Sequence, residues 1–223
     1  MDAKQEIRER VWARMEREGA ARFPGARGRI PNFRGAEAAA ARLAELSEWQ
    51  AARVIKANPD APQLPVRRRA YKEGRTLYMA VPRLADERPF VLVTGDPTIR
   101  RAMQEGRHQS LDDLQPVDLI VCGTVAVNSD GVRIGKGGGF SDLEYALLAE
   151  RGLAGDRTTI VTTVHPLQLV DEPLPETEHD FRVDLIVTPD EVVRTLLRRR
   201  PRGILWDHLD EDRRAAIPVL RGS

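Results

Sequence analysis

One continuous segment, residues 117–146, restricts the possible folds more than any other part of the sequence. It begins with the largely apolar run DLIVC, which is typical of a strand covered on both faces. A second short strand, an Asp130-Gly131 turn and a glycine-rich loop follow. The spacing then predicts a helix over 143–150, with Ser141 or Asp142 as its N-cap. This succession of strand, loop and helix indicates an α/β protein.

The glycine-rich loop, residues 135–139, has the chemistry of an anion site. Its three consecutive glycines carry no Cβ, so backbone N–H groups can approach an anion closely. Arg133 and Lys136 add positive charge next to a helix N-terminus, and Asp142 could hold the Mg²⁺ that accompanies a nucleotide. The spacing matches neither a Walker A loop nor a Rossmann fingerprint. From the residues alone, a glycine turn with solvated charges remains the alternative.

Length and composition predict a single α/β domain over residues 1–206 and a charged, partly loose tail over 207–223. The chain has 223 residues, 41% of them apolar, which is enough for one packed core. The net charge of +1 gives no general attraction to nucleic acid or membrane, and no nucleic-acid partner is expected. No apolar run approaches membrane-spanning length and the first residues lack a signal-peptide core, so we expect a cytoplasmic protein. The single cysteine, Cys122, is expected in the core.

Strand and helix patterns alternate along the chain. The sequence predicts helices over 2–18, 36–56, 99–104 and 190–199, and strands over 76–81, 90–94, 158–164, 183–188 and 203–206. This order favours one mostly parallel sheet with helices on both faces. Ligands of such sheets bind beyond the carboxyl ends of the strands. The glycine loop, His165 and the loop that ends at His179-Asp180 all follow strands, so they are expected to meet at one cleft.

Basic residues occur in three further groups. Lys4 and Arg8 lie four residues apart on one face of the first predicted helix, where they form either a solvated edge or part of a site. Arg67-Arg68-Arg69 lies in a predicted strand-loop region, and its charges are expected to be solvated. The run 198–202 follows a predicted helix, whose dipole favours cations at its C-terminus.

The central pattern resembles that of the 5-formyltetrahydrofolate cyclo-ligase (5,10-methenyltetrahydrofolate synthetase) family. The resemblance is carried by Gly123-Thr-Val-Ala126, by Asp130-Gly-Val-Arg-Ile-Gly-Lys-Gly-Gly-Gly-Phe-Ser-Asp142, and by Gln168 and His179-Asp180-x-x-x-Asp184. Within the family it is similar to the divergent methenyltetrahydrofolate synthetase domain-containing branch. The resemblance is strong over 117–190 and weaker over 1–116, where Lys4-x-x-x-Arg8 is similar to the N-terminal motif of the family.

This resemblance implies an α/β fold of the ribose-phosphate-isomerase and CoA-transferase type, and ATP with Mg²⁺ as cofactors. It implies attack of the formyl oxygen of 5-formyltetrahydrofolate on the γ-phosphoryl group, followed by ring closure at N10 with loss of phosphate. Catalysis of this kind is mainly positioning and charge neutralisation. The implied sites are ATP-phosphate contacts at Lys4, Arg8, Gly135, Lys136, Gly137, Gly138, Gly139 and Phe140, catalytic roles for Arg133 and Lys136, a metal ligand at Asp142, and a reduced-folate pocket at Phe140, His165 and Gln168.

Two departures from the family pattern leave the substrate open. Phe140-Ser141 replaces the Tyr-Tyr pair of the family, and the region 49–66 shows no acidic folate-pocket motif. Glu144 is an additional carboxylate near the loop, and its role, like that of His165, is not predicted. The alternatives are therefore an ATP-binding or RNA-associated protein on the same fold without cyclo-ligase activity, or a sugar-phosphate isomerase-like enzyme. The sequence makes no prediction of the oligomeric state.

Overall fold

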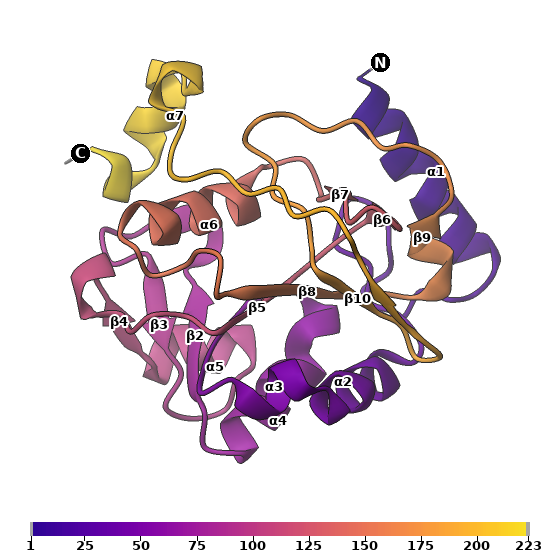
Figure 1. The fold of residues 1–223 in the computed structure, drawn as a ribbon, viewed down its shortest axis with the longest axis horizontal. Coiled ribbons are helices and arrows are strands. Elements are labelled where there is room, and N and C mark those ends of the chain that lie inside the picture. The colour runs from indigo at the N-terminus through magenta and orange to yellow at the C-terminus, as the bar shows by residue number, and fades with distance from the viewer. Residues whose placement is uncertain (1, 222–223) are drawn as a thin grey trace.

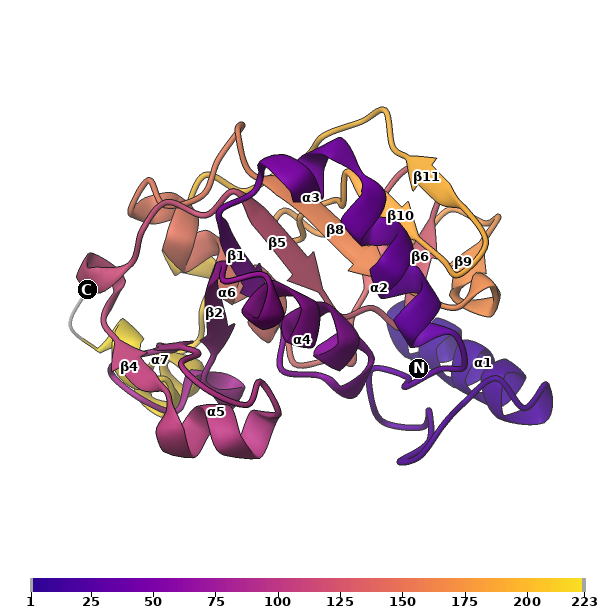
Figure 2. The same cartoon turned by 90° about the horizontal axis from the view of Figure 1, so that it is seen from below.

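A mostly parallel sheet of eight strands forms the centre of the protein, in a computed structural model that describes residues 2–221 (Figures 1 and 2). The strand order is β11-β10-β8-β5-β1-β2-β3-β4. The central strands are parallel, and β11, β3 and β4 pair antiparallel at the edges. The strands are β1 (Val54–Ala57), β2 (Thr76–Ala80), β3 (Phe90–Leu92), β4 (Arg107–Gln109), β5 (Leu119–Cys122), β8 (Thr159–Thr163), β10 (Leu185–Val187) and β11 (Val192–Arg194). The predicted α/β class is confirmed.

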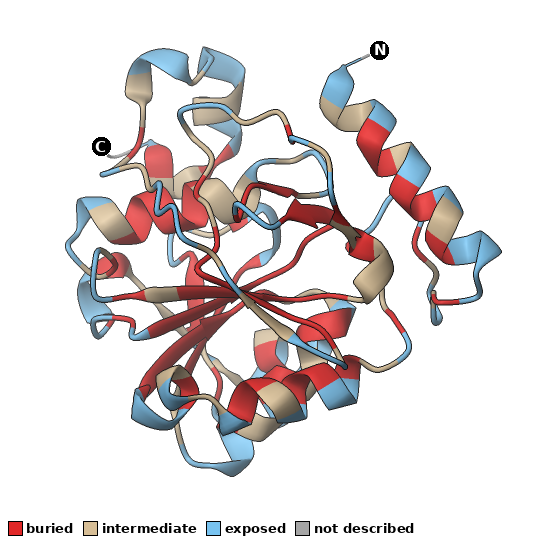
Figure 3. Ribbon diagram, turned by 45° about the vertical axis from the view of Figure 1, so that its right-hand side comes forward, coloured by how far each residue is buried: buried red, intermediate tan, exposed pale blue. Residues whose placement is uncertain are grey.

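Helices cover both faces of this sheet. Figure 1 shows α2, α3 and α4 on one side and α6 with α7 on the other, and Figure 2 shows α2 and α4 lying across the central strands. The side chains of β5 alternate between the two faces of the sheet. Leu119 and Val121 pack in the core under α2 and α4. Ile120 and Cys122 pack in the core under α6. The helices are α2 (Ala36–Glu45), α3 (Ser47–Ala51), α4 (Leu64–Lys72), α5 (Ile99–Glu105), α6 (Phe140–Glu150) and α7 (Glu211–Ala216). Figure 3 shows the central strands buried between the two layers.

A second, smaller sheet carries the N-terminal helix. It consists of β7 (Arg133–Ile134), β6 (Ala126–Asn128) and β9 (Leu169–Val170), in that order. The helix α1 (Ala3–Arg17) packs the buried side chains of Val11, Trp12 and Met15 into a core shared with this sheet. The chain leaves the small sheet at β7 and enters the glycine loop, so α1 lies next to the loop. Within residues 2–221, no helix is both long and apolar enough to cross a membrane.

The predicted helix over 36–56 was wrong at its C-terminal end. The structure ends α2 at Glu45, adds the short α3, and then places the central strand β1 at Val54–Ala57. All residues of β1 are buried, including Lys56. The predicted helix ended at Lys56, because a lysine is seldom buried and gives no signal of a central strand. Its burial here depends on the ion pair with Glu144, which is far away in the sequence.

The C-terminal part differs more from the prediction. Residues 192–194 form the edge strand β11 antiparallel to β10, where a helix was predicted, and residues 203–206 do not form the predicted strand. The β-branched pair Val192-Val193 suits an edge strand. The run 198–202 is therefore not at a helix end. Instead, Arg198 lies 3.1 Å from Asp184, and Arg200 also pairs with Asp184 and donates to the carbonyl of Gly155 at 2.6 Å.

Three smaller predictions also differ from the structure. Arg67 to Arg69 belong to the helix α4, and the Arg67 side chain is fully buried, where it donates to backbone carbonyls of Asp60 and Pro97. The helix α6 begins at Phe140, with Gly139 rather than Ser141 or Asp142 as its N-cap residue. Residues 207–221, expected to be partly loose, form α7 and two 3₁₀ turns and bury two apolar side chains.

An ion pair between Glu48 and Arg194 fastens β11 to α3. The hydrogen bond from Arg194 is the largest cause that lowers the pKa of Glu48 to about 2. Since this folded-state pKa lies below the ordinary 4.5, the pair stabilises the fold above about pH 4.5 and loses its effect as the pH falls toward 2. Arg194 is half exposed, so we expect Glu48→Gln to lower the free energy of unfolding by less than about 1 kcal/mol at pH 7. Urea unfolding at pH 3 should show a smaller decrease in the free energy of unfolding of Glu48→Gln than at pH 7. An equal decrease at both pH values would contradict this role of the pair.

Candidate functional site

The glycine loop joins β7 to α6 and adopts a backbone that only glycine tolerates well. Gly137 has φ +114° and Gly139 has φ +61°, both in the region that disfavours other residues. Between them, a Cβ on Gly138 would lie 2.8 Å from the Phe140 ring. The three consecutive glycines are therefore required by the path of the chain, which holds the loop close to the first turn of α6. A loop with this geometry leaves backbone N–H groups open to an anion.

The N-terminal helix brings Arg8 to the loop and Lys4 to the neighbouring segment, on the helix face that the two residues were predicted to share. Arg8 is buried and donates from Nε to the carbonyl of Gly135 at 2.7 Å, and its guanidinium lies over Gly137. Burial lowers the pKa of Arg8, but the group stays positively charged at neutral pH. Lys4 lies one turn earlier and forms a 2.6 Å ion pair with Asp180. The helix thus joins the loop to the segment that ends at His179-Asp180.

Arg133 and Asp142 form an ion pair at the base of the loop. The Nη2 of Arg133 lies 2.6 Å from Oδ1 of Asp142, and the guanidinium stacks 4.1 Å from the centre of the Phe181 ring. Asp142 also accepts a 3.3 Å hydrogen bond from the backbone of Phe181. Within residues 2–221, the buried Nε of Arg133 has no hydrogen-bond partner. The buried guanidinium therefore places a positive charge under the loop, where it holds the Asp142 carboxylate.

Lys136 and a group of buried polar residues lie on the strand side of the loop. Lys136 is 52% exposed, and its Nζ is 3.4 Å from Oδ1 of Asp60, which follows β1. Below them, Lys56 is buried, donates to Oδ1 of Asn58 at 2.6 Å and pairs with Glu144 of α6. Burial is the largest cause that raises the pKa of Glu144, and the Lys56 ammonium opposes it. This group fixes the carboxyl end of β1 against the helix that follows the loop.

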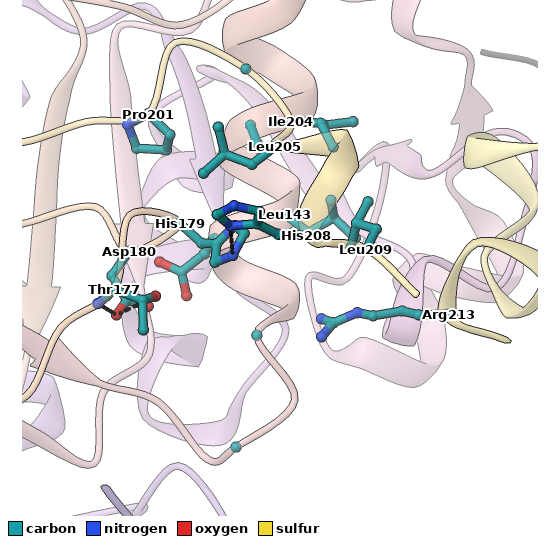
Figure 4. Close-up of a pocket in the computed structure, with 15 residues that line it drawn as sticks. Leu143, Thr177, His179, Asp180, Pro201, Ile204, Leu205, His208, Leu209 and Arg213 are labelled. Atoms are coloured by element: carbon teal, nitrogen blue, oxygen red, sulfur yellow. Dashed lines mark hydrogen bonds between the residues drawn. The ribbon is translucent and has the colours of Figure 1, made fainter. Parts of the chain in front are cut away.

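A cavity of about 210 Å³ opens beside the loop (Figure 4). The loop and Asp142 form one wall, and Asp180 with His179 forms another. Residues 201–213 supply the third wall, from which Figure 4 shows Arg213 extending toward the loop. The cavity is therefore bounded by charged groups at one end and by aliphatic side chains of α6 and the C-terminal segment at the other.

His165 and Gln168 do not line this cavity. His165 caps a 3₁₀ turn, with Nδ1 accepting a hydrogen bond from the backbone of Leu167 at 3.1 Å, and burial lowers its pKa. Gln168 is buried and donates to the carbonyl of Thr124 at 2.7 Å. Phe140 is not among the lining residues either, but it lies at the start of α6, half-buried next to the loop. Of the three predicted pocket residues, the structure brings only Phe140 to the glycine loop.

Several residues at the site were missed by sequence reasoning. Lys56, Asn58 and Asp60 were assigned to the end of a helix and its linker, so their position at the carboxyl end of a central strand was not seen. Asp180 had a signal, because it belongs to the His179-Asp180 motif. Arg213 had none, since its place at the loop depends on how the C-terminal segment packs.

The arrangement suits a phosphate-bearing ligand with a hard cation. Lys4, Arg8, Arg133 and Lys136 surround a backbone that carries no Cβ, which fits an anion of high charge density. No group of three or more His, Cys, Asp or Glu side chains within residues 2–221 forms a metal cage. Mg²⁺ does not need one, since it is often held by one or two carboxylates together with phosphates, and Asp142 and Asp180 both line the cavity.

The chain is similar to several known proteins. A methenyltetrahydrofolate synthase domain-containing protein from Mus musculus is 41% identical, covering 98% of this chain and 62% of that protein, and the one from Homo sapiens is 39% identical, covering 98% and 61%. The chain thus spans about three fifths of the length of these relatives. The NMR structure of Aquifex aeolicus 5,10-methenyltetrahydrofolate synthetase shares the fold, with a TM-score of 0.56 and 21% identity over 88% of this chain and 94% of that one.

The matching part of the chain contains the N-terminal helix, the small sheet and the glycine loop. The model of the 5-formyltetrahydrofolate cyclo-ligase family matches residues 1–189, which is most of the chain. The resemblance seen in the loop motif is therefore confirmed, and this chain belongs to the 5-formyltetrahydrofolate cyclo-ligase family.

Proposed function

We propose that the protein is an ATP- and Mg²⁺-dependent cyclo-ligase, which converts 5-formyltetrahydrofolate or a related reduced pterin to the 5,10-methenyl form. The observation that carries this proposal is the convergence of four cations, Lys4, Arg8, Arg133 and Lys136, on the glycine loop beside the carboxylate of Asp142. Family membership supplies the reaction type. The formyl oxygen is phosphorylated by ATP, and that oxygen then leaves as phosphate when the ring closes at N10.

Each cation has a distinct place in this proposal. Arg8 and Lys4 approach from α1, where they neutralise the charge of the polyphosphate chain. Arg133 is buried below the loop and pairs with Asp142, so we assign it to neutralising the developing charge from beneath the loop while it positions the Asp142 carboxylate. Lys136 is half exposed, so we assign it to the transferring phosphoryl group, where positive charge lowers the barrier most.

Asp142 is the residue proposed to hold Mg²⁺. One of its oxygens, Oδ1, accepts hydrogen bonds from Arg133 and from the backbone of Phe181, and Asp142 lines the cavity, so we assign the other oxygen to the metal. The fixed first oxygen orients the carboxylate and limits its rotation. A ligand held in this way supports the single-carboxylate coordination that Mg²⁺ accepts with phosphates.

The pterin is proposed to lie against Phe140, whose ring replaces the first Tyr of the family motif. The Asp60 carboxylate, 3.4 Å from Lys136, is suited to accept hydrogen bonds from the amino group of a pterin ring. His165 and Gln168 are proposed to act from outside the first layer of contacts, by fixing the turn after β8. Loss of both tyrosine hydroxyls points to a substrate whose polar edge is recognised elsewhere in the pocket.

The direct test is turnover with ATP, Mg²⁺ and 5-formyltetrahydrofolate, followed by the absorbance of the methenyl product. We expect product formation that depends on both ATP and Mg²⁺. Binding of ATP without turnover would leave an ATP-binding protein on this fold and would remove the folate substrate from the proposal. Related reduced pterins with an N5-formyl group should be tested in the same assay.

Replacing Lys136 with alanine should weaken the use of ATP without harm to the fold. The side chain is half exposed and makes one long contact, so its removal should leave the melting temperature within about 1–2 °C of wild type. Loss of a charge-assisted contact to phosphate should raise KM for ATP or lower kcat about tenfold or more. Lys72→Ala on the exposed end of α4 is the matched control and should change neither value. Unchanged kinetics in Lys136→Ala would remove this residue from the site.

A further inference from the structure

A C-terminal segment beyond the part matched by the family model packs next to the glycine loop. This segment, residues 203–221, buries Ile204, Ile217 and Leu220 in the same core as α6. Trp206 adds a 3.1 Å hydrogen bond from its indole nitrogen to Oε1 of Glu150. Figure 1 shows α7 over α6. Since α6 begins at the glycine loop, the segment is fixed to the element that positions the loop.

The same segment closes one side of the cavity. Ring nitrogens of His208 and His179 lie 3.2 Å apart, and the two rings are nearly perpendicular (Figure 4). Leu205 and Leu209 lie on either side of His208 along the chain and line the cavity with it. The wall formed by the segment thus contacts the His179-Asp180 loop, which belongs to the proposed ATP site.

Arg213 is the charged residue that the segment brings to the loop. Its Nη2 donates to the carbonyl of Gly138 at 2.7 Å, and its guanidinium lies 5.8 Å from the centre of the Phe140 ring. The Asp210 side chain accepts a 2.6 Å hydrogen bond from the backbone N–H of Arg213 and holds the first turn of α7. Arg213 therefore contacts the loop carbonyl in the same manner as Arg8, which donates to Gly135.

Arg213 differs from most cations at the loop because its charge is not balanced. Lys4 pairs with Asp180, Arg133 pairs with Asp142, and Lys136 lies near Asp60. In the part of the chain that the structure describes, no carboxylate lies within ion-pair distance of Arg213. A guanidinium has five N–H donors, of which the Gly138 carbonyl uses one. The remaining donors are available for an anion at the cavity.

We propose that Arg213 is an additional phosphate-binding residue of the glycine-loop site, and that residues 203–221 form one wall of that site. The inference rests on the proposed function in taking ATP as the ligand. A guanidinium matches phosphate oxygens in a bidentate manner, and here it is held in place by the loop, by Phe140 and by α7. Arg8 and Arg213 then grip the polyphosphate from two elements far apart in the sequence.

The test compares Arg213→Gln with Arg221→Gln in the full chain. Glutamine keeps a donor for the Gly138 carbonyl but removes the charge, so docking of the segment should persist. Arg221 is an exposed arginine of the same segment, and its guanidinium donates to the Ala215 carbonyl and not to the glycine loop, which makes it a matched control. Calorimetric titration should use two probes, ATP with Mg²⁺ and inorganic tripolyphosphate. We expect Arg213→Gln to bind both probes about tenfold or more weakly, and Arg221→Gln to bind as wild type.

Each outcome separates this inference from the proposed function. Wild-type ATP affinity in Arg213→Gln would overturn the inference alone, and so would tighter binding, which would mean that the segment opposes the ligand. In another outcome, the wild type binds tripolyphosphate but not ATP, and Arg213→Gln binds tripolyphosphate more weakly. That result would support the inference while the proposed function fails. Binding of neither probe would overturn both. If Arg213→Gln does not fold, hydrogen exchange of the wild type decides: tripolyphosphate should protect residues 207–221, and unchanged exchange would overturn the inference.

Discussion

Replacing Lys56 with methionine should lower the free energy of unfolding by about 3–5 kcal/mol, the cost of removing one partner from a buried ion pair. The Lys56 side chain is 2% exposed and that of Glu144 is 6% exposed. Methionine fills a similar volume but leaves the Glu144 carboxylate without its cation between β1 and α6. Urea unfolding at pH 7 measures the loss, and Lys72→Met on the surface of α4 is the control with the same change of side chain.

The pH dependence of the Lys56→Met variant identifies the cause of the loss. Burial raises the pKa of Glu144, and without Lys56 nothing nearby offsets that effect to the same degree. A carboxyl group whose folded-state pKa exceeds its unfolded value costs stability as the pH rises through that range. The variant should therefore be more stable at pH 5 than at pH 8, relative to wild type. The double variant Lys56→Met, Glu144→Leu should recover most of the loss. A double variant no better than the single one would show that poor packing, and not the unpaired charge, is responsible.

The Lys56–Glu144 pair also explains how the strand layer supports the loop. Asn58 accepts a hydrogen bond from Lys56 at 2.6 Å and donates to Oγ of Ser141 at 3.3 Å, in the first turn of α6. The end of β1 is thus tied to the residues that directly follow the glycine loop. The buried pair therefore helps to fix the start of α6 relative to β1. The placement of the cations around the glycine loop depends on that fixed start.

The sequence predicts the parts of this fold whose signals are local. The glycine loop, β5 and the N-terminal helix were recognised because glycine density, an apolar run and a helical spacing each occur within a few residues. The helix spacing placed Lys4 and Arg8 on one face, and only the family resemblance implied that this face meets the loop. These predictions needed no knowledge of partners distant in the chain.

The wrong predictions share a physical cause, which is dependence on a distant partner. Lys56 reads as a surface residue until Glu144 is placed beside it, so β1 was taken as the end of a helix. Arg67 reads as solvated until the carbonyl groups that it binds are known. The C-terminal segment contains a run of charged residues, 210–214, and the apolar residues that it buries, Ile204, Ile217 and Leu220, follow no helical or strand period across that run. Contacts of this kind are set by tertiary packing and not by propensity.

Replacing Gly139 with alanine should lower kcat/KM about 100-fold, provided the loop acts as the phosphate cradle. Gly139 has φ +61°, a conformation that costs other residues about 1–2 kcal/mol. A Cβ there would also lie 3.0 Å from Nη2 of Arg213. The backbone should relax by shifting the loop, and displacement of about 1 Å at a catalytic site is sufficient for a loss of that size. Steady-state kinetics and ATP titration measure the effect.

Gly74→Ala provides the matched control for the backbone penalty. Gly74 has φ +69°, nearly the same conformation, and a Cβ there would meet no atom within 4 Å. It follows α4, away from the loop. Both variants should lose a similar free energy of unfolding, about 1–2 kcal/mol, because the strain is the same. Only Gly139→Ala should lose activity and ATP affinity. Equal activity in the two variants would mean that the conformation of the loop serves the fold and not the phosphates, and the assignment of the glycines would then fail.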